Sequence, residues 1–157
     1  MQAACTYRRV TSQSGVGLIE VLVAVVVLSI GFLGMGALLA RSMSTNNSSM
    51  ARSMATIASY SILDAMRADG RNAKQGAYNT DAPITADACP TDTDTLAKAQ
   101  LAQWCDLLKR SLGAASSTSG KVNCQGDGTC AITITFDDSR AGDGGSDKQQ
   151  LTTRAML

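Results

Sequence analysis

This chain of 157 residues contains no histidine and a single glutamate, Glu20. The absence of histidine excludes Ser-His-Asp and Cys-His nucleophiles and every His-ligated metal site, because the required base or ligand is missing. All other acidic residues are aspartates, so a site built on paired carboxylates would depend on aspartates alone. We therefore predict that the protein is not an enzyme and binds no cofactor.

Aromatic residues and an excess of charge are also lacking. Phe, Trp and Tyr make up 4% of the chain, which argues against an aromatic platform for stacking bases. Fourteen basic residues stand against thirteen acidic ones. The formal charge of +1 is too balanced to indicate a nucleic-acid groove or an anionic-lipid surface, so no nucleic-acid partner is expected.

What the chain does have is a concentration of apolar residues near its start. Residues 16–40 form a run of 25 residues in which Glu20 is the only charge. As a helix this run measures about 37 Å, enough to cross a bilayer core of about 30 Å. The basic pair Arg8 and Arg9 predicts a cytoplasmic N-terminus, with the chain after Ala40 on the other side of the membrane.

A cleaved secretory signal is the plain alternative for this run. Its apolar region is usually about 7 to 15 residues long and ends in small residues at A-x-A spacing, whereas residues 38–40 read Leu-Leu-Ala. No cysteine directly follows the run, which excludes a lipoprotein site. A membrane-spanning helix is therefore favoured, followed by a polar head whose thin core needs further support.

The next segment, residues 41–69, is amphipathic and contains neither proline nor glycine. Its apolar residues recur three or four positions apart, as on one face of a helix. We predict a single helix over residues 17–69, with Gly70 as its C-cap. The predicted apolar face comprises Met43, Met50, Met54, Ile57, Ala58, Ile62, Ala65 and Met66.

Residues 70–95 hold both prolines and are predicted to form a long connection. A second helix is expected from Thr95, its candidate cap, to Leu112, followed by a Ser/Gly linker over residues 113–120. The predicted apolar face of this helix comprises Leu96, Leu101, Trp104, Leu107 and Leu108.

The last part of the chain has the pattern of strands. Period-two alternation of β-branched residues predicts a hairpin of strands 121–124 and 130–136. A polar Asp/Gly loop is expected over residues 137–147, and residues 149–157 are predicted to add an edge strand. The loop aspartates Asp137, Asp138, Asp143 and Asp147 have enough oxygens for calcium, but without a fixed ligand spacing a solvated loop is favoured. The same holds for Asp81, Asp87, Asp92 and Asp94.

The segment Gly15-Val16-Gly17-Leu18-Ile19-Glu20 opens the apolar run. A charged carboxylate at the centre of a membrane helix is disfavoured by about 2.5 kcal/mol or more, and such residues usually have a partner and a role. Glu20 lies near one end, where the penalty is smaller. A cut after Gly15 would place the new amine of Val16 one helical turn from Glu20, and the same amine on a neighbouring chain could neutralise this carboxylate.

This segment resembles the class III signal of type IV pilins and pseudopilins. The resemblance implies that a prepilin peptidase removes a leader ending at Gly15, that Val16 becomes the methylated N-terminus and that Glu20 directs assembly. The family usually has Phe at the position of Val16 and Thr or Ser at the position of Gly17. Residues 18–24 and 27–34 resemble in particular the PilV-type minor pilins, also called type IV pilus modification proteins.

The fold implied by this resemblance is α+β: a long N-terminal helix, transmembrane and then amphipathic, packs on a small antiparallel-sheet head with two disulfides. The expected parts are a leader (1–15), the transmembrane and assembly half of the first helix (16–40), its amphipathic half (41–69) and a periplasmic or extracellular head (70–157).

The implied function is that of a minor pilin that primes type IV pilus assembly and lies in or at the tip of the filament. The implied partners are the other minor pilins, the major pilin, the prepilin peptidase and the inner membrane, which holds the chain before it reaches the pilus. A minor pseudopilin of type II secretion is the alternative, and a membrane-anchored periplasmic enzyme is the weakest reading.

Four of the five cysteines follow the apolar run and would face an oxidising periplasm, where disulfides persist. Four cysteines allow three pairings. A Cys124–Cys130 bond would close the hairpin, and a Cys89–Cys105 bond would tie the long connection to the second helix; this is the pairing we expect. Zinc is the alternative, but the chain has neither histidine nor a C-x2-C pair. Cys5 would leave with the leader.

Overall fold

The structure, a computed structural model, describes residues 15–157 apart from the side chains of residues 142 and 143. Most of the predicted leader, including Cys5, Arg8 and Arg9, lies outside the described residues. The chain divides at Ala40 and Arg41 into two compact units, and α1 contributes residues to both.

α1 runs without interruption from Leu18 to Ala68, which confirms the single long helix predicted from hydrophobic periodicity. Every residue from 15 to 43 is exposed. Among the described helices, α1 alone is long and apolar enough to cross a membrane. The core helix of a soluble protein would bury its apolar residues within the fold. In α1, none of the apolar residues from 18 to 40 is buried.

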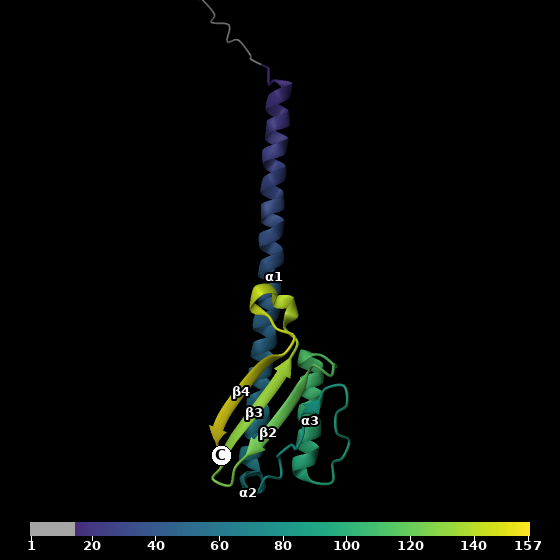
Figure 1. The fold of residues 1–157 in the computed structure, drawn as a ribbon, viewed down its shortest axis with the longest axis vertical. Coiled ribbons are helices and arrows are strands. Elements are labelled where there is room, and N and C mark those ends of the chain that lie inside the picture. Colours follow the sequence, from purple (N-terminus) through teal and green to yellow (C-terminus); the bar gives the residue numbers. More distant parts are fainter. Residues whose placement is uncertain (1–14) are drawn as a thin grey trace, which may run out of the picture. The chain divides into compact units, whose positions relative to one another are not determined.

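The second unit contains a four-stranded antiparallel sheet with strands in the order β1-β2-β3-β4 (Figure 1). The strands are β1 (Ile84–Thr85), β2 (Ser119–Cys124), β3 (Thr129–Phe136) and β4 (Gln149–Met156), and the helices of this unit besides α1 are α2 (Gly70–Lys74), α3 (Leu96–Leu112) and the short 3-10 helix η1 (Ser139–Gly144). The hairpin, the second helix and the edge strand predicted from sequence are confirmed.

The core lies on one face of this sheet, where α1 and α3 both pack. Buried residues alternate along β2 and β3, as expected for strands with one covered face. Trp104 of α3 donates its indole N–H to the carbonyl of Ala58 on α1, with an N–O distance of 2.9 Å. The sulfurs of Met66 on α1 and Cys124 on β2 lie 3.6 Å apart. Helix α1, α3 and the sheet therefore share a single core.

The predicted apolar face of α1 is correct only in part. Met66, Ala58 and Ile62 are buried, but Met43, Met50 and Ile57 are exposed. In the turns nearest the membrane-spanning run, small residues are buried or half-buried in their place. Small side chains allow the rest of the head to approach the helix backbone closely, whereas methionines on the predicted face would hold it away. The buried or half-buried small residues are Ser48, Ala51, Ala55 and Ser59.

Gly70 is not the C-cap that we predicted. α1 ends at Ala68, and α2 begins at Gly70 after a single turn residue, Asp69. Gly70 is not among the glycines with positive φ, whereas Gly76, after α2, is. The helical path is therefore interrupted at Asp69 and resumes for one turn.

Three other details differ from the sequence prediction. Leu96 begins α3 but is 58% exposed, so it is not part of the apolar face. The linker after α3 ends at Thr118, because β2 begins at Ser119 and pairs with β1, a strand that was not predicted. The polar loop 137–147 contains η1 and the buried Asp138.

The two disulfides join Cys89 to Cys105 and Cys124 to Cys130, as expected. The first ties the connection after β1 to α3, and the second links two residues that face each other in the β2–β3 ladder. The long apolar helix, the small antiparallel sheet and these two bonds fit the type IV pilin fold.

Candidate processing and assembly site

Gly15 lies outside regular structure, and the packing of the described residues gives no reason for a glycine there. A Cβ atom built at this position would meet nothing within 4 Å among them, and the backbone does not have a positive φ. Gly15 therefore has no packing role among the described residues. The exposed, non-helical backbone at residues 15–17 is also accessible to a peptidase.

The helix starts directly after these residues. The carbonyl of Gly17 accepts from the N–H of Glu20 at 3.0 Å and of Val21 at 3.3 Å. Gly17 therefore occupies the N-cap position, where it offers no side-chain oxygen to the free N–H groups of the first turn. Val16 lies directly before this N-cap, and its spacing to Glu20 in the cleaved chain stays a prediction.

Glu20 is in the first turn of α1, where a carboxylate interacts favourably with the positive end of the helix dipole. Its side chain is exposed and has no hydrogen bond or ion pair to any residue that the structure describes. The neighbouring Val16, Leu18 and Ile19 are 70%, 92% and 72% exposed. Apart from the helix dipole, the described part of the chain therefore offers this carboxylate no partner.

The aspartates of the 137–147 loop do not form a metal site in the described part of the chain. Among the described residues, no three side chains of His, Cys, Asp or Glu are grouped so that they could hold a metal ion. Asp138 is instead buried, and its Oδ2 accepts from Ser48 Oγ at 2.6 Å and from Arg52 Nη2 at 3.3 Å. The N–H of Ser139 hydrogen-bonds to the Asp137 carboxylate, which lowers the pKa of Asp137. These contacts account for Asp137 and Asp138, and the side chain of Asp143 lies outside the described residues.

The contact of Asp138 with α1 was not predicted from the sequence. Arg52 and Ser48 are separated from Asp138 by 86 and 90 residues, and no local pattern links residues so far apart. The sequence does hold a partial signal for this contact. Small residues recur at helical spacing along this part of α1, and an arginine lies among them, beside the buried face: Ser48, Arg52, Ala55 and Ser59.

Residues 11–36 match the prokaryotic N-terminal methylation motif. The matched residues include Gly15, Val16 and Glu20, and the match ends within the apolar part of α1. This prepilin-type motif supports a type IV pilin or pseudopilin, and it implies processing by a prepilin peptidase and assembly with other pilins. No match was found among curated proteins or among solved structures.

The motif and the apolar helix are consistent with a protein that is anchored in a membrane and assembled into a pilus. The motif covers only the start of the chain. The motif therefore does not include the head and does not distinguish a pilin from a pseudopilin.

Proposed function

We propose that this chain is a minor pilin of the PilV type, which joins other minor pilins to prime a type IV pilus and remains in or at the tip of the filament. The observation that carries the proposal is a carboxylate, Glu20, that has no partner among the described residues and lies in the first turn of an exposed apolar helix, five positions after a glycine with no packing role there. The disulfide-bonded head on the same chain supports a pilin rather than a plain membrane anchor.

The proposed processing step is cleavage of the Gly15–Val16 bond on the cytoplasmic face of the inner membrane. It removes Cys5 with the leader, so the mature chain has only disulfide-bonded cysteines. The new amine is then methylated on Val16. A positive amine just before α1 lies at the positive end of the helix dipole, an unfavourable position that the Glu20 carboxylate offsets.

The proposed assembly step pairs Glu20 with the amine of Val16 on a neighbouring chain. In the apolar interior of a membrane or filament an unpaired charge is costly. Docking is therefore favourable where a carboxylate and an amine meet, and a subunit without the carboxylate leaves the amine of its neighbour unpaired. No catalytic group is needed for this role.

Glu20→Ala tests the proposal. The variant should insert into the membrane at least as well as the parent, because the apolar run becomes more hydrophobic. It should also be cleaved, because the cut lies five positions upstream. It should be lost from sheared pili, measured by immunoblotting of the shear fraction and mass spectrometry of the mature N-terminus. Glu20→Gln, which removes only the charge, should fail in the same way.

Asp106→Ala is the matched control. Asp106 is an exposed carboxylate on α3 with no ion pair in the described part of the chain, and its removal should leave assembly intact. Recovery of Glu20→Ala in pili at the parental level would refute the docking role. Deletion of the chain separates the two candidate functions: a minor pilin is required for surface pili, whereas loss of protein secretion with intact pili would establish a minor pseudopilin.

A further inference from the structure

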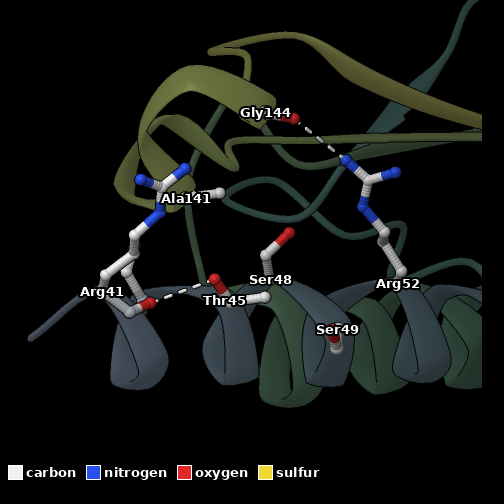
Figure 2. A pocket seen from close by; sticks show the side chains of 8 residues that line it. Arg41, Thr45, Ser48, Ser49, Arg52, Ala141 and Gly144 are labelled. Carbon is white, nitrogen blue, oxygen red and sulfur yellow. Dashed lines mark hydrogen bonds between the residues drawn. The ribbon is translucent and has the colours of Figure 1, made fainter. Parts of the chain in front are cut away.

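The head has a pocket beside the first turns of α1 that follow the apolar run. It has a volume of about 660 Å³, within the roughly 300 to 1,000 Å³ of small-molecule sites. Figure 2 shows Arg41 and Arg52 at opposite ends of the pocket, with Thr45 and Ser48 between them and Ala141 and Gly144 of the η1 segment above. The two arginines are three helical turns apart, which places them on the same side of α1.

Three of the four hydroxyl groups that line this pocket already donate hydrogen bonds within the head, and Ser49 is the fourth. Thr45 Oγ1 donates to the carbonyl of Arg41 at 3.0 Å, Ser48 Oγ donates to Asp138, and Ser44 Oγ donates to the carbonyl of Arg140. These hydroxyls therefore offer lone pairs rather than hydrogen atoms. The side-chain N–H groups that remain for a ligand belong to the two guanidinium groups.

The two arginines differ in how far they are neutralised. Arg52 uses Nη2 for Asp138, for the carbonyl of Gly144 at 3.2 Å and for Gln149 at 3.4 Å, while its other two nitrogens have no partner in the described chain. Arg41 is exposed, and its guanidinium group makes no hydrogen bond or ion pair with any residue that the structure describes. Among the residues whose side chains the structure describes, the pocket therefore has one guanidinium group, that of Arg41, without a carboxylate partner.

A phosphate group fits this chemistry, since it accepts several hydrogen bonds and guanidinium groups bind it in a fork geometry. Arg41 is also the first charged residue after the apolar run. The residue that follows a membrane-spanning run enters the headgroup layer. We propose that this pocket binds the phosphate of an anionic phospholipid headgroup while the chain is held in the inner membrane. This inference rests on the proposed membrane anchoring.

Such a contact would orient the head on the membrane before assembly and would be lost when the chain leaves the bilayer. The near-zero net charge of the whole chain does not show this local charge: of the two arginines, only Arg52 has a carboxylate partner, Asp138, among the described residues. Extraction into a filament would then replace lipid at Arg41 with protein or water.

The test is headgroup selectivity of the full chain in a neutral detergent, measured by native mass spectrometry with phosphatidylglycerol, phosphatidylcholine and inorganic phosphate as probes. The parent should retain phosphatidylglycerol in preference to phosphatidylcholine. Arg41→Gln should weaken this retention roughly five- to tenfold, the effect of one basic residue at an anionic membrane surface. Arg41→Lys should keep part of the preference for phosphatidylglycerol, because lysine keeps the positive charge but lacks the forked N–H donors of the guanidinium group.

Arg110→Gln is the matched control, since Arg110 is exposed on α3 and does not line the pocket. Equal weakening by Arg41→Gln and Arg110→Gln would overturn the site, as would equal retention of the two lipids or binding of inorganic phosphate alone. Membrane anchoring is measured separately by alkaline extraction. A chain that stays in the membrane pellet but lacks headgroup selectivity would overturn this inference and leave the proposed function standing.

Discussion

From Gly15 to Ala40 every side chain is exposed, whereas the head buries a continuous core shared by α1, α3 and the sheet. In the first region, residue identities are not set by contacts within the chain. In the proposed function they are set by the membrane, by a peptidase and by neighbouring subunits. In the head, residue identities follow from packing and hydrogen bonds. A substitution should therefore affect either interactions with other molecules or folding, according to the region in which it lies.

The largest effect expected in the first region is that of Gly15→Val. The peptidase must accommodate a residue without a side chain beside the cut, so this variant should stay at the full precursor mass. The free energy of unfolding of the head should be unchanged, because Gly15 makes no contact there. Intact-mass spectrometry measures the cleavage, and Trp104 fluorescence during urea unfolding measures the free energy of unfolding. Normal cleavage of the variant would remove the basis for reading residues 1–15 as a leader.

Gly120→Ala should show the opposite pattern. A Cβ atom at Gly120 would lie 2.3 Å from the Trp104 ring and 2.8 Å from Leu108 Cδ1, so the indole and α3 must move. Overpacking of this kind costs about 3 kcal/mol at the upper end of its usual range. Urea unfolding should show this loss while cleavage after Gly15 continues. Gly126→Ala, in the exposed hairpin turn with no atom near its Cβ, should stay close to the parent.

The two regions also differ in how far the sequence predicts them. The processing segment could be recognised because Gly15, Val16 and Glu20 form one short motif. Local patterns likewise revealed α3, whose cap Thr95 accepts from the N–H of Lys98, and the hairpin closed by Cys124 and Cys130.

Features that depend on distant contacts could not be predicted. β1 has only two residues, Ile84 and Thr85, too few to show a period. The buried face of α1 was misassigned because hydrophobicity favours methionine over alanine and serine, whereas close approach of the head selects small side chains. The contact of Arg52 with Asp138 joins residues that only the folded head brings together.

The disulfides provide a graded test of head stability. In the chain-entropy account, the stabilisation grows with the number of residues in the closed loop. The sequence separations are 16 for Cys89–Cys105 and 6 for Cys124–Cys130. Replacing the first pair by serine should cost about 3 kcal/mol and replacing the second about 2 kcal/mol. Urea unfolding of the two double variants measures the order, and a larger loss from the hairpin pair would show that strand geometry outweighs loop length.

The smallest expected effect is a pH dependence confined to the head. Tyr78 is fully buried, and burial together with the nearby Asp69 carboxylate raises its pKa from 10.0 to about 12. Its hydroxyl donates to Gln100 and lies 3.3 Å from Asp69 Oδ2. Between pH 10 and 12 the unfolded chain loses this proton while the folded chain keeps it. The stability that Tyr78 contributes is therefore fully present below pH 10 and is lost as the pH rises toward 12.

Tyr78→Phe isolates this contribution. At neutral pH the variant should lose about 1 kcal/mol of stability, the usual worth of one hydrogen bond. Above pH 10 its stability should fall less steeply than that of the parent, because phenylalanine has no proton to release. Tyr60→Phe is the matched control for the loss of a tyrosine hydroxyl: Tyr60 is 53% exposed on α1, and this variant should keep the parental stability at neutral pH. Urea unfolding at a series of pH values measures both slopes. Parallel slopes for the parent and Tyr78→Phe would mean that the hydroxyl titrates alike in the folded and unfolded chain, and the buried contacts of Tyr78 would then not hold its proton.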